Sequence, residues 1–417
     1  KEPARWVTLL SENGSGKTTI LQAIALMLAG PDAASQLLSR PIGWLKIENT
    51  AGKISTRIHK DQCDSGVFGN EKQRTTFGYS THVTGREKIT IRNKPFNTPG
   101  IHESSDRILS WLRQNAFSPE SNGWFAVGYG AFRRLTRSHQ VIVPSLDPPS
   151  RYTNFLTQSY EDEGLAAFEQ WMIYLDYRQA KEKDPKAKQQ KEMGVSAINA
   201  LLPTGVKFDR IDTDGRIIFD VNGSKVPTIS LSDGYRSVLA LAGDLVWRLI
   251  SSFPNSANPL HEKGVVLIDE LDIHLHPIWQ RNIAQWLQDQ FPNLQFIVST
   301  HSPMVAAGAG SQALTLKISK DKASALPVTQ SLFAMDVDDI LKSEAFDLVS
   351  TYSPQTQEKL DKFSTLRSKT ERLKSHEKQE LQQLSLFIEK YNPYNIDTFD
   401  QTTEEKIDAY IKSKVNK

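Results

Sequence analysis

The sequence is poor in cysteine, since Cys63 is the only one among its 417 residues. A single cysteine excludes an intrachain disulfide framework and a multi-cysteine zinc site, and it suits a reducing compartment. No apolar run approaches the roughly 20 residues that a membrane-spanning helix needs. No signal-peptide pattern opens the sequence either. We therefore expect a cytoplasmic protein with no membrane partner.

The sequence also lacks an excess of charge of one sign. Its 50 Lys and Arg residues nearly balance its 48 Asp and Glu residues, which leaves a formal net charge of +2. Such a balance gives no reason to expect that the whole surface binds nucleic acid or a membrane. The chain is nevertheless long enough for two or three lobes and a sizeable core.

Hydrophobic periodicity predicts an alternation of strands and helices. We expect, in chain order, a strand at 6–10, a buried helix at 19–28, short antiparallel strands between 40 and 100, a helix at 104–116, a buried strand with a glycine-rich turn at 124–135, a helical lobe at 153–202, a hairpin of strands 206–211 and 216–221, a helix at 232–250, a strand at 264–268, a helix at 277–291 and a strand at 295–299. This alternation predicts an α/β fold with a mostly parallel sheet and covering helices.

We expect four regions. Residues 1–150 form the N-terminal part of an α/β head with an antiparallel β lobe, and residues 151–205 form an inserted helical lobe. Residues 206–330 complete the head and its mixed sheet, and residues 331–417 form a helical region that docks a partner. The charged stretch 355–391 reads as helical, with apolar residues at 3-4-3 spacing at Leu381, Leu384, Ile388 and Tyr391. That seam suits either a partner helix or packing on its own domain.

A glycine-rich loop follows the first strand and consists of Asn13, Gly14, Ser15, Gly16, Lys17, Thr18 and Thr19. Glycines let backbone N–H groups approach phosphate oxygens, the Lys17 ammonium meets the outer phosphates, and the Thr18 hydroxyl is a magnesium ligand in this arrangement. The usual pattern begins with glycine where this sequence has Ser11. If that position requires an unusual backbone angle, Ser11 costs on the order of 1 kcal/mol or more.

An apolar strand ends in two acids at Asp269 and Glu270. We expect Asp269 to hold magnesium through water and Glu270 to be the general base for the attacking water. His301 follows the next strand, and we expect it to contact the γ-phosphate. His274 and His276 invite a metal-site interpretation, but no third ligand stands nearby, so we favour a structural or dimer-contact role.

A helix opens at Leu231-Ser232-Asp233-Gly234, where Ser232 and the Gly234 N–H present an anion-binding end. The phosphate loop already serves the nucleotide of its own head. We therefore expect this helix start to serve the opposite head, so that two ATP molecules are held between two subunits.

Taken in order, these motifs resemble the RecF/Rad50/SMC-like ABC-type ATPases, which are not transporters. Within them the chain is most similar to a bacterial group of predicted ATP-binding proteins, and the resemblance rests on residues 231–245, 264–280, 296–303, 128–134 and 41–46. It covers roughly residues 6–310. ATPases of this class usually begin with one or two strands before the phosphate loop, so we expect the sequence to lack a short N-terminal segment.

The group includes the PtuA ATPases of Septu anti-phage systems and of some retrons, which work beside an HNH nuclease called PtuB. The resemblance implies a defence ATPase that uses ATP and Mg²⁺, dimerises around ATP and controls a separate HNH nuclease. A retron reverse transcriptase with its nucleic acid is a further partner that it leaves open. The sequence does not place the glutamine that usually links the core to the helical lobe, and Gln140 and Gln158 are two candidates.

An alternative is a DNA-repair or DNA-end-sensing clamp, which predicts salt-dependent duplex binding and ATPase stimulation by DNA. A Toprim nuclease domain needs a DxD cluster on a βαβ scaffold. The sequence offers only Asp336 to Asp339, followed by helix-rich sequence, so we expect any nuclease in another chain.

Overall fold

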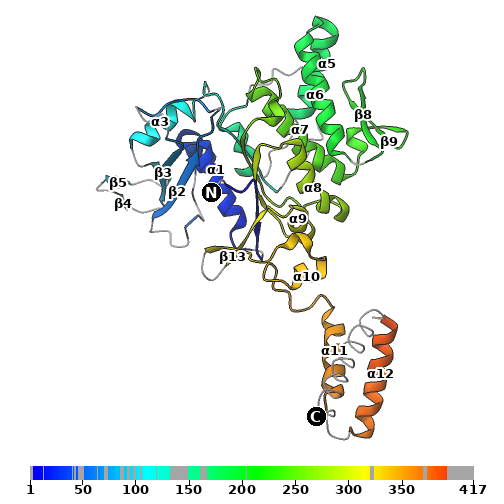
Figure 1. Cartoon of the computed structure of the whole chain (residues 1–417). Coiled ribbons are helices and arrows are strands. Elements are labelled where there is room, and N and C mark those ends of the chain that lie inside the picture. The colour runs from blue at the N-terminus through cyan, green and yellow to red at the C-terminus, as the bar shows by residue number, and fades with distance from the viewer. Residues whose placement is uncertain are drawn as a thin grey trace, which may run out of the picture. The chain divides into compact units, whose positions relative to one another are not determined.

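The computed structural model of the chain forms two compact units, Lys1–Phe346 and Asp347–Lys417 (Figure 1). The structure describes residues 3–12, 14–39, 41, 44–45, 51–62, 64–69, 74–84, 89–91, 94–96, 100–103, 106–118, 120–131, 149–159, 167–202, 204–319, 324–369 and 373–391. Among these residues, no helix has both the length and the apolar character needed to cross a membrane.

The first unit is built on a six-stranded sheet with the order β14-β13-β1-β12-β11-β7. Its strands are β1 Trp6–Leu10, β7 Phe125–Tyr129, β11 Gly264–Ile268, β12 Leu294–Ser299, β13 Leu314–Ser319 and β14 Ser324–Pro327. Strands β13, β1, β12, β11 and β7 run parallel, and β14 is antiparallel to β13. The sheet is therefore mixed, as predicted, although β13 and β14 were not predicted.

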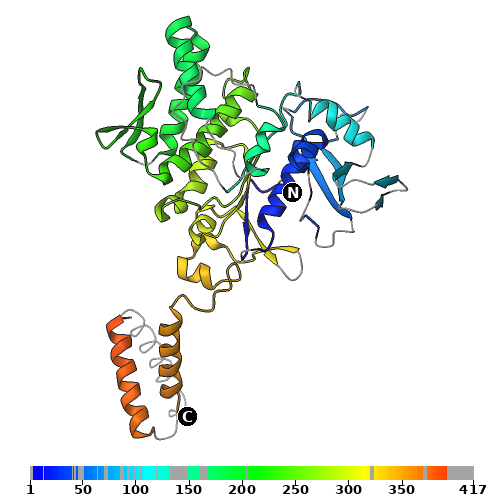
Figure 2. The same ribbon diagram turned by 180° about the vertical axis from the view of Figure 1, so that it is seen from behind.

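Helices cover both faces of this sheet (Figures 1 and 2). On one face α1 (Lys17–Ala29) packs on Leu9 and Leu267. On the other face α7 (Asp233–Ser252) and α8 (Pro277–Gln290) pack on Val266 and Phe296. Side chains of successive strand residues point to opposite faces, so the same buried strands serve both layers. The phosphate-loop helix α1 and the helix α7 thus lie on opposite faces of the sheet.

An antiparallel lobe follows α1, in agreement with the predicted strands between 40 and 100. Its sheet has the order β2-β3-β6, and α3 packs beneath β3. The aromatic rings of Phe77 and Trp111 stack there with centroids 4.4 Å apart. The elements of this part are α2 Pro31–Leu37, β2 Ala51–His59, β3 Thr76–Thr84, β4 Ile89–Ile91, β5 Lys94–Phe96, β6 Gly100–Glu103 and α3 Arg107–Asn115.

A helical lobe leads back to the head. Helices α5 and α6 pack on each other and on α7. Close packing is possible at Gly194, where an added Cβ would lie 3.1 Å from the Trp171 ring. The predicted hairpin is present, and its first strand has the predicted bounds 206–211. A third strand, which was not predicted, pairs with the second strand of the hairpin. The elements are η1 Thr153–Phe155, α4 Leu156–Ser159, α5 Ala167–Tyr177, η2 Arg178–Glu182, α6 Pro185–Leu201, β8 Val206–Ile211, β9 Ile217–Val221 and β10 Ser224–Pro227.

The C-terminal part of the first unit buries Leu332 and Ile340 against Leu10. Residues 331–346 therefore pack with the head. Asp336 is the N-cap of α10 and accepts a hydrogen bond from the Asp339 N–H at 2.9 Å, so the acidic run opens a helix. The helices here are α9 Pro303–Gly308 and α10 Val337–Lys342.

The second unit is a pair of helices, α11 (Pro354–Arg367) and α12 (Ser375–Tyr391), which contact each other. The stretch 355–391 is helical, as predicted, and it consists of two helices. Leu384 and Ile388 are buried within this unit. The apolar seam thus packs within its own unit, one of the two readings that the sequence left open.

Candidate functional site

The glycine-rich loop connects the end of β1 to the first turn of α1. Gly14 and Gly16 adopt φ values of 73° and 94°, a region that favours glycine because side chains with a Cβ clash there. Thr18 and Thr19 are exposed on the first turn of the helix. Asn13 lies outside the described residues. The loop therefore ends at a helix N-terminus whose free N–H groups suit an anion.

Ser11 does not carry the backbone strain considered above, because its φ is not among the positive values of the described residues. Its side chain has a different role. The Ser11 hydroxyl contacts the Ser15 hydroxyl and accepts a hydrogen bond from Lys17 Nζ at 3.2 Å. Serine at this position therefore adds a polar group to the inside of the loop.

Lys17 folds back over the loop and is 6% exposed. Its Nζ donates to the carbonyl oxygens of Ser11 at 3.0 Å and Glu12 at 3.2 Å. Burial lowers the pKa of the ammonium below the ordinary lysine value, while the carboxylates of Asp269 and Glu270 oppose that shift. The ammonium thus occupies the loop interior within the electrostatic reach of both acids.

The two acids stand where β11 ends. Asp269 is 2% exposed, and its N–H donates to the Tyr129 carbonyl of β7 at 2.8 Å. Glu270 has a φ of 47°, an uncommon conformation for a residue with a long side chain. Such strain at the end of a strand is typical of functional sites.

Ser299, the last residue of β12, holds both acids. Its hydroxyl donates to Asp269 Oδ1 and accepts the Glu270 N–H at 2.8 Å. The candidate sites named from the sequence did not include this serine, because its hydroxyl acts on residues about thirty positions away. The signal was its place directly before Thr300 and His301 at the end of a buried strand.

The loop after Glu270 is tied to the segment after β12. Asp272 Oδ1 accepts the Thr300 hydroxyl and the His301 N–H, the latter at 3.1 Å. The Ser302 hydroxyl donates to Gln280 Oε1 at 2.7 Å. His301 is thereby fixed through its backbone next to the acids, with its ring partly exposed. Among the described residues, no group of three or more His, Cys, Asp or Glu could hold a metal ion.

Ser232 and Gly234 lie at the start of α7, where Ser232 is exposed and Gly234 is half-buried. Within the described residues, the Ser232 hydroxyl makes no capping hydrogen bond to its own helix. A Cβ added to Gly234 would lie 3.1 Å from the carbonyl oxygen of His274, so the loop after Glu270 packs against this helix start. The partners described for Lys17 belong to its own loop, not to α7.

Gln158 is one of the two glutamines that the sequence left undecided, and the structure places it beside α1 and β7. Its side chain is 5% exposed, and neither amide atom has a hydrogen-bond partner among the residues that the structure describes. Its carbonyl oxygen accepts a hydrogen bond from Gln22 Nε2 of α1 at 3.3 Å. A buried amide without partners is costly unless a ligand completes it. Gln140, the other candidate, lies outside the described residues.

The donor set fits a phosphate group with a magnesium ion. Magnesium prefers oxygen ligands, and Thr18, Asp269 and Gln158 offer a hydroxyl, a carboxylate and an unpaired amide oxygen. Lys17 supplies the cation for phosphate. A phosphate loop after the first strand and an acid pair at the end of a central strand define a P-loop ATPase of the ABC type.

Comparisons with known proteins agree with this class. A family described as "AAA domain, putative AbiEii toxin, Type IV TA system" matches residues 12–307. Because this match covers most of the chain, the chain belongs to this family of AAA-domain ATPases. The family implies nucleotide binding.

Individual relatives and structures are also similar. A Septu protein PtuA of Bacillus mycoides (strain KBAB4) is 26% identical over 414 residues, which cover 98% of this chain and 50% of the relative. A "Retron Ec83 probable ATPase" of Escherichia coli is 44% identical over 122 residues, 29% of this chain and 22% of that protein. The Smc head bound to the C-winged helix domain of ScpA has a TM-score of 0.44 and 15% identity, and the match covers 79% of this chain and 92% of that chain. The chain spans half the length of the Septu relative.

Proposed function

We propose that this chain binds and hydrolyses ATP with Mg²⁺, that two copies close around the nucleotide, and that this cycle controls a partner HNH nuclease in anti-phage defence. The observation that carries the proposal is the position of Lys17 within the electrostatic reach of Asp269 and Glu270, beside the N-terminus of α1. The names of the Septu and retron relatives support the defence role.

In the proposed site, ATP displaces the carbonyl oxygens of Ser11 and Glu12 from the Lys17 ammonium. The N–H groups of the loop and of the α1 N-terminus then bind the phosphate oxygens. Thr18 and Asp269, the latter through water, would hold magnesium together with the Gln158 amide oxygen. The bound metal would neutralise charge on the β- and γ-phosphates.

Glu270 is the proposed general base. The Glu270 N–H is held by the Ser299 hydroxyl at 2.8 Å, which fixes the start of its side chain beside Asp269. From that position its carboxylate orients the attacking water and accepts its proton. His301, held by Asp272, would contact the γ-phosphate.

Dimerisation follows from the two sides of the sheet. Ser232 and Gly234 open α7 on the face opposite α1, so they do not complete the phosphate loop of their own chain. Their exposed helix start suits the γ-phosphate of a nucleotide bound to a second copy. Each of two sites is then completed by the other copy.

Nucleotide binding is tested by replacing Lys17 with alanine. Because Lys17 supplies the cation inside the loop, K17A should lose at least 100-fold in ATP affinity, about 2.7 kcal/mol. Equilibrium binding of a fluorescent ATP analogue measures the affinity. An unchanged affinity would refute the assignment of the loop.

Catalysis and dimerisation are tested together with Glu270→Gln. The amide cannot accept a proton, so hydrolysis should fall by at least 100-fold while ATP still binds. In sedimentation analysis the variant should become a dimer when ATP and Mg²⁺ are added, and adding Ser232→Arg should prevent it. Full hydrolysis by E270Q would remove Glu270 as the base, and an ATP-loaded monomer would remove the dimer.

The partner is tested by co-expression. An HNH nuclease encoded beside this chain should co-purify with it, and its nucleic-acid cleavage should differ between wild type and E270Q. A reverse transcriptase with its nucleic acid is the other partner to be examined in the same way. A nuclease that neither binds the chain nor responds to E270Q contradicts this part of the proposal.

A further inference from the structure

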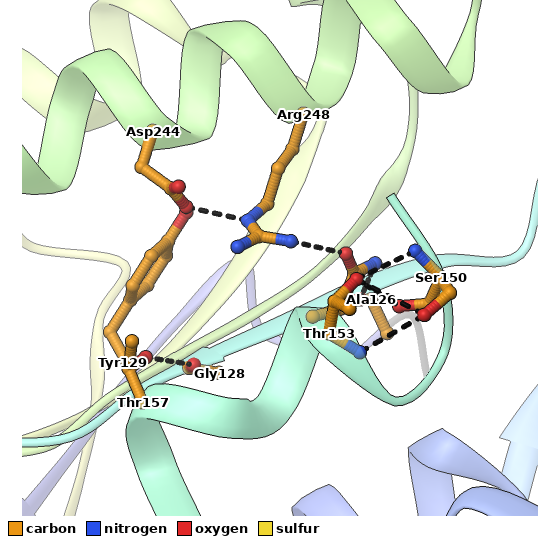
Figure 3. Close-up of polar contacts among 9 residues, drawn as sticks. Ala126, Gly128, Tyr129, Ser150, Thr153, Thr157, Asp244 and Arg248 are labelled. Atoms are coloured by element: carbon orange, nitrogen blue, oxygen red, sulfur yellow. Dashed lines mark hydrogen bonds and ion pairs between the residues drawn. The ribbon is translucent and has the colours of Figure 1, made fainter. Parts of the chain in front are cut away.

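A chain of buried polar side chains joins α7 to β7 (Figure 3). Asp244 Oδ2 accepts the Tyr129 hydroxyl at 2.8 Å and Arg248 Nε at 2.5 Å. Arg248 then donates through Nη1 to Asn154 Oδ1 at 2.7 Å. Asp244 and Tyr129 are fully buried, and Arg248 is 6% exposed. A buried ion pair of this kind keeps its partners, because separating them leaves an uncompensated charge in the interior.

The segment 153–158 is held on the outer edge of the central sheet. Strand β7 is the last strand of that sheet among the residues that the structure describes, and none of these residues pairs as a strand with its outer edge. Side chains take that place, since Asn154 Nδ2 donates to the Ala126 carbonyl at 2.9 Å and Thr157 Oγ1 donates to the Gly128 carbonyl at 3.1 Å (Figure 3). The segment is thus fixed by side-chain contacts and not by a β ladder.

Gly128 in β7 and Gly130 directly after it make this close approach possible. A Cβ on Gly128 would lie 1.8 Å from Gln158 Oε1, and a Cβ on Gly130 would lie 2.2 Å from the Thr157 carbonyl oxygen. Tyr129, between these glycines, is on the opposite side of the strand and reaches Asp244. One short strand therefore contacts the Gln158 segment on one side and α7 on the other.

The two ends of this connection lie in two different proposed ATP sites, one formed by this chain and one that its α7 start completes in a second copy. Gln158 is at one end, with its unpaired buried amide, and the backbone N–H of Asp269 is held by the Tyr129 carbonyl. At the other end, α7 runs from Arg248 back to its start at Asp233, about 22 Å away at 1.5 Å per residue. A helix of this length moves as one piece, so a shift at either end is carried to the other.

We propose that Arg248 and Asn154 are positioning residues, through which α7 holds the Gln158 segment against the sheet. The position of the Gln158 amide in one ATP site and that of the α7 start, which serves the other site, then depend on each other. This inference rests on the proposed ATPase function, and it names the residues that link the two sites. Asn154 connects the two elements, because it bonds both Arg248 of α7 and the Ala126 carbonyl at the edge of β7.

The link is tested first without nucleotide, by hydrogen–deuterium exchange of the full chain. Asn154→Ala removes the bonds to Arg248 and to the Ala126 carbonyl, and it keeps the Asp244–Arg248 pair. Arg248→Lys keeps the positive charge, but a lysine cannot bond Asp244 and Asn154 at the same time. Each variant should raise exchange in 153–159 by about tenfold. The double variant should exchange no faster than N154A alone, because N154A already removes the bond to Asn154 that R248K breaks.

The second measurement uses a Glu270→Gln background with ATP and Mg²⁺. ATP should slow exchange both in 153–159 and in the first turn of α7, residues 233–237. With N154A the protection of 153–159 should fall by at least fivefold, together with a loss of the response at 233–237. Asn154→Asp keeps the acceptor for Arg248 but loses the donor to the Ala126 carbonyl, so it should restore the response at 233–237 only in part.

Val83→Ala is the matched control, since it removes buried volume in β3, away from this network. It should lower the melting temperature without changing exchange in 153–159. Exchange there that is equal in N154A, R248K and V83A overturns the proposal, and so does a double variant whose effect is the product of the single effects. If K17A still binds ATP normally, the proposed function is wrong. Hydrogen–deuterium exchange without nucleotide then still tests whether Arg248 and Asn154 position the Gln158 segment.

Discussion

Ser299 illustrates how one hydroxyl organises the acids of the site. It binds the Asp269 carboxylate and the Glu270 N–H, and its own strand lies directly beside β11. The serine thereby fixes both the direction of Asp269 and the strained backbone at Glu270. Groups that orient ligands in this way commonly affect activity more than stability.

Replacing Ser299 with alanine is therefore expected to lower kcat by about 10–100-fold. The free energy of unfolding should fall by about 1–2 kcal/mol, because a buried carboxylate loses a donor. Steady-state ATPase assays and urea unfolding measure the two effects. Thr8→Val is the control, since the Thr8 hydroxyl is equally buried and bonds Trp6. An equal loss of kcat in both variants would contradict the assignment.

The pKa of Lys17 predicts how ATP affinity depends on pH. Burial lowers this pKa in the free protein, and phosphate binds the protonated ammonium. Affinity should thus be full below that pKa and fall by up to about tenfold per pH unit above it, as a proton must then be taken up on binding. This fall should begin at a lower pH than for an ordinary lysine.

Equilibrium binding of ATP between pH 7 and pH 10 measures this dependence. Lys17→Arg is the control, because a guanidinium stays charged throughout that range. Its affinity should be nearly constant with pH, even where it is weaker than that of the wild type. An identical pH dependence in the arginine variant would assign the titration to another group.

Strand β7 shows how an element's sequence follows from what it must accommodate. Its residues are all buried, and Gly128 faces the segment that carries Gln158. The sequence analysis identified a buried strand and a glycine-rich turn here, but it assigned no reason to the glycines. The reason is the close approach of a segment about thirty residues later in the chain.

Gly128→Ala is expected to displace that segment, because the added Cβ overlaps Gln158 Oε1. Overpacking of this kind costs about 1–3 kcal/mol of the free energy of unfolding. The ATPase rate at saturating ATP should fall with it, as Gln158 moves. Gly78→Ala is a suitable control, since its Cβ would meet an ordinary contact at 3.4 Å. Thermal unfolding and ATPase assays distinguish the two, and equal tolerance of both changes would contradict the packing argument.

Other elements show where sequence patterns are sufficient. The phosphate loop, β11 and the strand at 206–211 follow from contiguous residues with strong periodicity or spacing. The break between α11 and α12 did not follow, because the charged residues there are compatible with a continuous helix. The two helices contact each other, which requires the chain to turn between them. A contact between separate helices cannot be read from the local sequence.

The division of the molecule into two compact units suggests a division of labour. The first unit contains every described residue of the proposed ATP site, and the second contains the helix pair. Residues 331–346 belong to the first unit through Leu332 and Ile340, so a cut inside them would expose part of its core. Residue 346 is therefore the natural place to shorten the chain.

A chain ending at Phe346 is expected to keep ATP affinity and hydrolysis within about twofold, because the truncation removes no site residue. It should lose co-purification with the HNH nuclease if the second unit docks that partner. ATPase assays and affinity purification of the co-expressed pair measure both outcomes. Retained co-purification would move the docking surface to the first unit. A full-length chain with its second unit intact but Leu386→Glu on an exposed face of α12 gives a milder comparison.

The sequence alone was sufficient for the ABC-type ATPase class and for the candidates Lys17, Asp269, Glu270 and Ser232, whose roles stay predictions. Their signals are short and contiguous, because a phosphate loop, an acid pair and a helix start are each built from neighbouring residues. The tertiary structure alone brought Gln158 to the edge of β7. It also joined Tyr129 to Asp244 across 115 positions and Arg248 to Asn154 across 94. Contacts over such separations leave no periodic trace in a sequence, since they depend on how whole elements pack.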